Sequence, residues 1–272
     1  MIRKFALSAV VSCVALTSAA FAEENALDLV TQDATAAEDF CDEACQIARK
    51  AQDPLAPITA LLTDNSINYG PNGLKGTEFQ LQPVYTFEGE NANVILRGII
   101  PTLGVKDPGT GKTSYGLGDT MVQAFYVPTA YSGGFKLGYG VQAVLPTARD
   151  SRFSKFGKGA GVGIVGFGFN GNFSYGGVAG HLWTDNASIS TLQPILFYNM
   201  PNFLGGTYVG YSNTWSYNWD TDTAVVPLGG VFGKTFITKG GNAIDFNIGA
   251  YKDVANSNDD WTLKFGLSFF PG

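Results

Sequence analysis

The sequence is dominated by segments of roughly ten residues in which apolar and polar side chains alternate with a period of two. In the segment 135–145, for example, Leu137, Tyr139 and Val141 alternate with polar residues or glycine. After residue 58 no apolar run reaches the roughly 18 residues that a membrane-spanning helix requires. The alternation therefore predicts β-strands that each have one apolar face.

The number and length of these segments favour a closed barrel over a soluble sandwich. We expect twelve strands, within a range of about ten to fourteen, because bacterial barrels have an even number of strands that each cross the bilayer in roughly ten residues. The expected strands cover 58–69, 77–87, 93–102, 116–127, 135–146, 160–169, 173–183, 189–199, 206–217, 223–236, 243–252 and 261–270. Short turns rich in Gly, Asn or Pro alternate with connections that include the longest polar loops, which is the layout of an outer-membrane barrel. The predicted fold class is all-β, an antiparallel transmembrane β-barrel over residues 58–272.

Glycine is concentrated in this predicted barrel. The chain contains 35 glycines, and the first of them is Gly70. With only 15% charged residues, this composition argues against a helical bundle and against disorder. Inward-facing glycine relieves curvature and side-chain crowding in a small barrel. The net charge of −6 speaks against nucleic acid as a partner.

The N-terminus has the pattern of a secretory signal peptide over residues 1–22. Arg3 and Lys4 precede a mostly apolar stretch, and Ala20-Phe21-Ala22 forms a cleavage site. We expect export to the bacterial outer membrane with cleavage after Ala22. Residues 23–57 then form an acidic periplasmic segment, with nine acidic side chains and two basic ones.

Within the acidic segment, a capping box of Thr35 and Glu38 predicts a short periplasmic helix over about 36–52. Cys41 and Cys45 lie four residues apart on one side of this helix. In an oxidising compartment they are candidates for a disulfide, although a regular helix is not ideal geometry for one. Free or intermolecularly paired thiols are an alternative. A redox or metal role has less support because no C-x-x-C motif is present.

Polar residues on the inward face of the predicted strands are candidates for lining a lumen. They are Gln80, Gln82, Arg97, Gln123, Lys136, Gln142, Gln193, Asp245, Asn247 and Lys264. The mixed charges argue against strong ion selectivity. The segment 160–169 departs from the pattern because it has apolar residues on both faces. In a barrel of this size such side chains largely fill the lumen, and the acidic segment is placed to plug it from the periplasmic side.

The chain lacks patterns typical of an enzyme, a cofactor site or a metal site. The segment 109–113 resembles the end of a P-loop, but position 106 is lysine and no helix is expected to follow. A Ser-His hydrolase would need Ser190 or Ser212 within hydrogen-bond distance of His181, and no motif selects either serine. We therefore expect no enzymatic activity, no cofactor and no metal, and we interpret His181 as a residue of the outer rim.

Four basic residues recur every three positions in a predicted outer loop: Arg149, Arg152, Lys155 and Lys158. One interpretation is that this basic patch contacts the phosphates of lipopolysaccharide. The alternative, which we favour, is an ordinary solvated loop.

Several short motifs in a fixed order resemble a bacterial outer-membrane family known as meta-pathway phenol-degradation, or transporter-like, proteins. The motifs are Leu81-Gln82-Pro83, GLGD at 116–119, LPTA at 145–148, Leu192-Gln193-Pro194, YNWDTDTAVVPLGGVFGKTF at 217–236 and DWTLKFGLSFF at 260–270. The resemblance covers about residues 75–272 and implies an outer-membrane β-barrel. It implies little about mechanism.

These observations favour a porin-like passive channel or transporter for small solutes, among them aromatic or apolar ones. The alternative is a non-conducting structural or surface-interaction barrel, and an outer-membrane hydrolase has the least support. The expected partners are outer-membrane lipid, lipopolysaccharide and small-molecule solutes.

Overall fold

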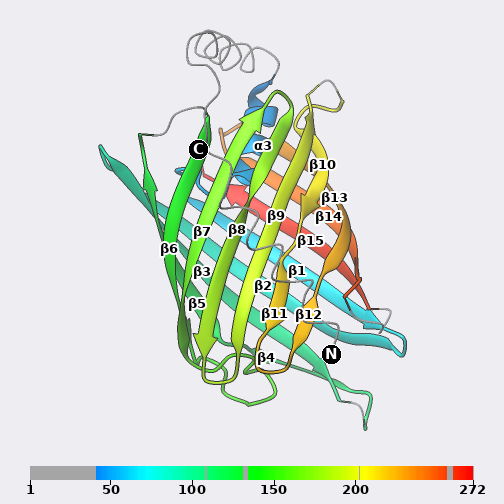
Figure 1. Cartoon of the computed structure of the whole chain (residues 1–272). Coiled ribbons are helices and arrows are strands. Elements are labelled where there is room, and N and C mark those ends of the chain that lie inside the picture. The colour runs from blue at the N-terminus through cyan, green and yellow to red at the C-terminus, as the bar shows by residue number, and fades with distance from the viewer. Residues whose placement is uncertain (1–40, 108, 131–133, 202, 256–259, 272) are drawn as a thin grey trace, which may run out of the picture. The chain divides into compact units, whose positions relative to one another are not determined.

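The computed structural model describes residues 41–107, 109–130, 134–201, 203–255 and 260–271. These residues form mostly strands and one short helix (Figure 1). The elements are α3 (Glu43–Gln52), β1 (Ala60–Gly70), β2 (Gly73–Phe87), β3 (Ala92–Lys106), β4 (Thr113–Leu117), β5 (Thr120–Pro128), β6 (Phe135–Leu145), β7 (Gly159–Asn170), β8 (Phe173–Thr184), β9 (Ser188–Met200), β10 (Thr207–Ser212), β11 (Trp215–Asn218), β12 (Thr223–Val225), β13 (Pro227–Ile237), β14 (Ala243–Asp253) and β15 (Trp261–Phe270). The expected signal peptide and the capping box at Thr35 and Glu38 lie outside the described residues.

All the strands pair antiparallel in one ring. The order around it is β10, β13, β14, β15, β1, β2, β3, β5, β6, β7, β8 and β9, and β9 pairs again with β10. The remaining three segments continue strands of this ring, because β4 pairs with β3 like β5, β11 pairs with β9 like β10, and β12 extends β13. Within the described residues the fifteen segments thus form a closed barrel of twelve strands. This confirms the predicted fold class and strand number.

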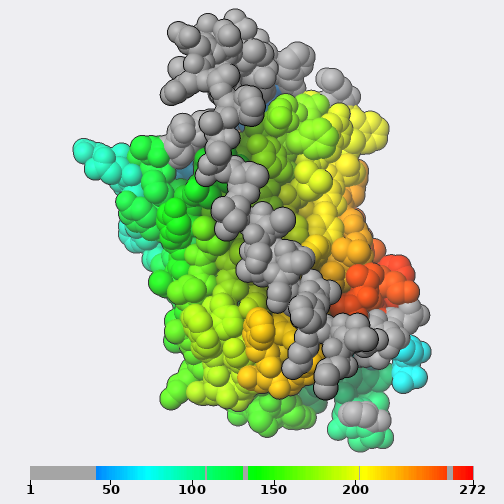
Figure 2. Space-filling model, viewed as in Figure 1, coloured from blue at the N-terminus to red at the C-terminus, as the bar shows by residue number. Residues whose placement is uncertain are grey.

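The ring closes between the first and last strands of the chain. β1 pairs with β15 from Leu61 opposite Phe269 to Tyr69 opposite Trp261. Strands that follow one another in the sequence otherwise lie side by side, so the face shown in Figure 2 passes from green through yellow to orange.

The outward face of the barrel is apolar. On β6, Leu137, Tyr139 and Val141 are 43%, 53% and 61% exposed. A soluble protein would bury such a face, whereas in a membrane barrel it contacts lipid. The alternation in the sequence therefore corresponds to lipid-facing and inward-facing positions. Among the described residues, no helix has the length and apolar character needed to cross a membrane.

The helix starts later than the sequence predicts. α3 begins at Glu43 rather than near residue 36, because Cys41 and Asp42 are not helical; residues 36–40 lie outside the described part. Asp42 is the N-cap, and its Oδ1 accepts a hydrogen bond of 2.8 Å from the backbone N–H of Cys45. Cys41 and Cys45 form a disulfide with Cα atoms 5.2 Å apart. Since Cys41 precedes the cap, the bridge does not have to fit a regular helix.

Candidate functional site in the barrel lumen

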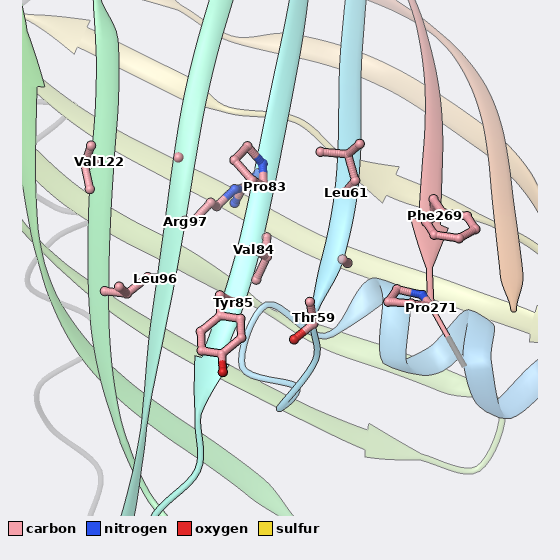
Figure 3. Close-up of a pocket in the computed structure, with 12 residues that line it drawn as sticks. Thr59, Leu61, Pro83, Val84, Tyr85, Leu96, Arg97, Val122, Phe269 and Pro271 are labelled. Atoms are coloured by element: carbon pink, nitrogen blue, oxygen red, sulfur yellow. The ribbon is translucent and has the colours of Figure 1, made fainter.

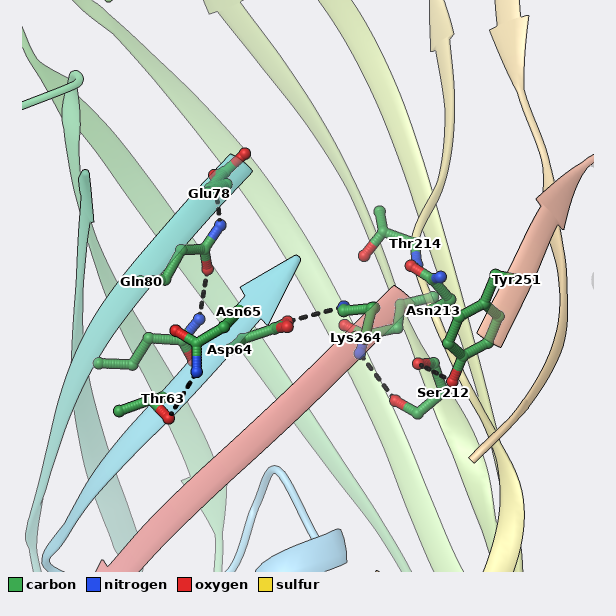
Figure 4. A network of polar contacts seen from close by, with 12 residues as sticks. Thr63, Asp64, Asn65, Glu78, Gln80, Ser212, Asn213, Thr214, Tyr251 and Lys264 are labelled. Carbon is green, nitrogen blue, oxygen red and sulfur yellow. Dashed lines mark hydrogen bonds and ion pairs between the residues drawn. The ribbon is translucent and has the colours of Figure 1, made fainter. Parts of the chain in front are cut away.

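Polar side chains fill the inward face on one side of the barrel, between its middle and the end opposite α3 (Figure 4). We call this end the loop end and the other the helix end. The polar cluster consists of Asp64, Glu78, Gln80, Gln82, Arg97, Gln123, Gln142, Lys155 and Lys264.

A chain of hydrogen bonds runs along the inward face of β2 and onto β3. Gln80 Nε2 donates to Glu78 Oε1 at 2.7 Å, and Gln82 Nε2 donates to Gln80 Oε1 at 2.5 Å. Arg97 on β3 donates from Nη2 to Gln82 Oε1. The residues alternate with outward side chains such as Phe79, so the period of two places them all inside.

Two ion pairs lie in or beside this row. Lys264 on β15 contacts Asp64 on β1, with Nζ and Oδ2 2.8 Å apart. Lys155, in the connection between β6 and β7, contacts Glu78 on β2 at 2.8 Å. Because β2 and β6 are separated by β3 and β5 in the ring, the second pair links this loop to a strand that is not its neighbour.

The loop between β6 and β7 is held to the barrel wall by further contacts. Asp119 accepts hydrogen bonds from Ser154 Oγ and from the backbone N–H groups of Phe156 and Gly157, at 2.9 to 3.0 Å. Phe153 is 5% exposed and lies over Gly116, where a Cβ atom would come within 2.4 Å of its ring. Glycine at this position therefore makes room for the loop.

The four basic loop residues are all exposed, but two of them are paired with carboxylates. Lys155 points inward to Glu78, and Arg152 is paired with Asp150 at 2.7 Å. Hydrogen bonds from the Arg152 side chain lower the pKa of Asp150 to about 2. Arg149 is exposed.

The helix end of the lumen holds an apolar cluster, buried polar groups such as Asp245 and Asn199, and residues 41–59, which we call the plug. Ala48 of α3 and Leu55 just after it are 0% and 1% exposed. They belong to an apolar cluster with wall residues Val84, Ile95, Phe125, Val127, Val165, Phe167, Ile195, Phe197 and Tyr208. A Cβ atom at Gly138 of β6 would lie 2.8 Å from Leu55 Cδ2, so the absence of a side chain there leaves space for Leu55.

Polar contacts at the rim fix the plug to the wall. Asp53 and Lys136 form an ion pair at 2.7 Å, in which the side chains are 2% and 19% exposed. Gln52 donates to Asn199 Oδ1 at 2.8 Å. Arg49 lies over the ring of Phe169, 4.4 Å from its centre. Such nearly buried pairs are costly to break on one side only.

All ten residues predicted to line the lumen have inward-facing positions, but the structure divides them. Six belong to the polar cluster: Gln80, Gln82, Arg97, Gln123, Gln142 and Lys264. Lys136 holds the plug, and Gln193 donates to Ser212 Oγ at 3.0 Å. Asp245 is 3% exposed and accepts hydrogen bonds from Tyr208 and Thr235. Asn247 lies on the same face of β14, beside Gly266.

Three polar-cluster residues were missed from the sequence. Asp64 and Glu78 have the inward parity of their strands, which is a signal that the sequence contains. Lys155 could not be placed because it reaches the lumen from a loop.

The outward wall has an apolar groove where β2 and β3 separate locally (Figure 3). Pro83 has no N–H to donate, and the pairing of the two strands is interrupted between Leu81–Ile100 and Val84–Arg97. The groove has a volume of about 490 Å³. Its lining includes Leu61, Tyr85, Leu96, Val122, Phe269 and Pro271.

His181 lies on the outward face of β8 near the loop end. Its Nδ1 is 2.8 Å from Ser190 Oγ and its Nε2 is 3.2 Å from Ser188 Oγ. Trp219 Nε1 donates to the same Ser190 oxygen at 2.9 Å. Of the two serines considered from the sequence, Ser190 is therefore the one beside His181, and no carboxylate of the described residues orients the ring. Nor do the described residues bring three His, Cys, Asp or Glu side chains together in a way that could hold a metal ion.

No protein-family model and no curated protein matches the chain. Among solved structures it is similar to the COG4313 outer membrane channel from Pseudomonas putida F1, with a TM-score of 0.57 and 14% identity over 79% of this chain and 96% of that chain. The KdgM porin has a TM-score of 0.48 at 12% identity, covering 78% of this chain and 99% of the porin. A variant of outer membrane phospholipase A from Escherichia coli has a TM-score of 0.44 at 15% identity, covering 85% and 99%. The first of these similarities shows that the chain shares the β-barrel fold of that outer membrane channel.

Proposed function

We propose that this protein is an outer-membrane channel for small solutes that the plug closes at rest. In this proposal the chain is exported and α3 lies on the periplasmic side. The observation that carries it is the division of the lumen, with a polar cluster toward one end and an apolar cluster completed by the plug at the other. The sequence resemblance to transporter-like proteins supports the same class of function.

The plug has the properties of a movable gate. Its apolar contacts are made by Ala48 and Leu55, with Ile47, Ala51 and Ile58 packed beside them, whereas the barrel wall is held by continuous strand pairing. The plug is a short segment at the start of the described chain, so its release leaves every strand pair intact. Solutes then pass from the polar cluster along the space that the plug had filled.

Conductance of the full-length protein in planar lipid bilayers tests this proposal. Wild-type protein should show rare openings, and Asp53→Ala should open more often because Lys136 loses its partner at the rim. Asp150→Ala is the matched control, since it removes an exposed ion pair at the opposite end of the barrel. Absence of current from both wild type and Asp53→Ala, with no solute flux in liposome swelling, would refute the proposal and favour the non-conducting structural barrel.

A further inference from the structure

We infer that Arg97 binds the anionic group of a small organic solute, a carboxylate or a comparable oxyanion, within the polar cluster. This inference rests on the proposed function, because it assumes that solutes reach the lumen. It adds a chemical class of ligand and the residue that recognises it.

Among the charged residues of the polar cluster, Arg97 is the one cation without a described ion-pair partner. Lys264 is paired with Asp64, and Lys155 is paired with Glu78, each at 2.8 Å. Arg97 is the third cation, and no described carboxylate lies within ion-pair distance of it. Asp64 attracts it through space, but the Oδ2 atom of that residue is held by Lys264. An anionic ligand at Arg97 would neutralise this remaining charge.

The hydrogen bonds of Arg97 also leave donors unused. Its Nη2 donates to Gln82 Oε1, whereas Nε is buried without any hydrogen-bond partner among the described residues. A guanidinium has five N–H donors in a planar fork that matches the two oxygens of a carboxylate. The residue as a whole is only partly buried, whereas its Nε atom is not itself exposed. A carboxylate would supply both the missing acceptor and the missing charge.

The neighbours of Arg97 suggest what the rest of the ligand is like. Gln82 and Gln123 flank it with amide groups, since Gln123 is its partner across the β3–β5 pair. Toward the helix end, the same faces of β2 and β3 carry Val84 and Ile95 of the apolar cluster. Arg97 therefore lies at the boundary between polar and apolar lining, which suits a solute with an anionic head and an apolar or aromatic body.

The test is calorimetric binding of benzoate to the full-length protein in a non-ionic detergent, with benzamide as the neutral probe of similar shape. Benzoate should bind wild-type protein more tightly than benzamide does. Arg97→Gln should weaken benzoate binding roughly 10- to 150-fold, as expected for loss of a hydrogen bond to a charged group. Arg97→Lys should retain part of the affinity because it keeps the charge. Arg152→Gln, which changes an exposed loop arginine, should bind benzoate like wild type.

Three results would overturn the inference: equal affinity of wild type and Arg97→Gln, equal affinity for benzoate and benzamide, or no benzoate binding in the millimolar range. Circular dichroism and heat-dependent gel migration show whether the variants form the barrel. If Arg97→Gln does not, Arg97→Lys carries the test, and benzoate affinity equal to wild type in that variant overturns the inference. Because binding is measured without a membrane, failure here leaves conductance unaffected. Conversely, a protein that shows no conductance but binds benzoate through Arg97 would refute the proposed channel function and leave this inference standing.

Discussion

If the proposed function holds, replacing Leu55 by alanine should release the plug and increase the fraction of time that the barrel conducts. Leu55 is 1% exposed and belongs to the apolar cluster that closes the helix end. Truncation of a leucine in such an environment costs about 2–5 kcal/mol. The barrel wall does not depend on this side chain, so the substitution reduces the free energy that holds the plug in the lumen.

The expected change in population follows from this free energy. Since about 1.4 kcal/mol corresponds to tenfold in an equilibrium constant, the undocked plug becomes roughly 30- to 4,000-fold more populated. Gly138→Val should act in the same direction from the wall, because a Cβ atom there would lie 2.8 Å from Leu55 Cδ2. Leu137→Ala is the matched control, since this neighbouring leucine points outward and is 43% exposed.

Single-channel recording in planar bilayers and limited proteolysis of residues 41–59 measure the two consequences. Leu55→Ala and Gly138→Val should raise open probability and speed cleavage of the plug, while Leu137→Ala should do neither. The reasoning is refuted if Leu55→Ala accelerates cleavage but leaves conductance at the wild-type level, because the plug would then not be what closes the lumen.

Three further outcomes concern the loop end. Gly116→Val should displace Phe153, whose ring would meet the added Cβ at 2.4 Å, and faster proteolysis of the loop between β6 and β7 would show this. Because hydrogen bonds from Arg152 lower the pKa of Asp150 to about 2, the carboxylate stays charged as the pH falls from 7 to 5. A depressed pKa contributes stability that is present above the ordinary carboxyl value of about 3.9 and is lost as the pH falls through about 2, so an NMR titration midpoint for Asp150 near pH 4 would contradict the contact. The wild-type protein should not hydrolyse phospholipid in a fluorogenic assay, and activity that His181→Ala abolishes would establish the hydrolase instead.

Most of the fold could be predicted from the sequence because the period of two is preserved from strand to strand. The two faces of a membrane barrel have different environments, with lipid outside and polar groups or packed side chains inside. The alternation along each strand therefore shows which side chains face the lipid. The interruptions within three wall strands were not foreseen. At Gly118 and Asp119, for example, the chain leaves the regular ladder so that the Asp119 carboxylate can bind the loop between β6 and β7. Such a contact depends on residues more than thirty positions apart.

The interior was predicted less completely. The segment 160–169 has apolar residues on both faces because Val165 and Phe167 point inward into the apolar cluster. The sequence suggested a plug but not its depth or its partners. The observed helix starts at Glu43 rather than near residue 36, because Asp42 caps α3. Lys136 and Asp53 are far apart in the sequence, so their pairing depends on the closed ring.

The pairing of β1 with β15 sets an order of events during assembly. The strand that must accept the last segment of the chain is the first one synthesised, so the wall cannot close until the whole polypeptide has been delivered. The plug immediately precedes β1 in the chain. Pairing between segments so distant in the sequence generally slows folding. Mutations that weaken docking of the plug should therefore still allow the wall to close. Mutations that prevent β1 from pairing with β15 should leave no closed lumen in which the plug can dock.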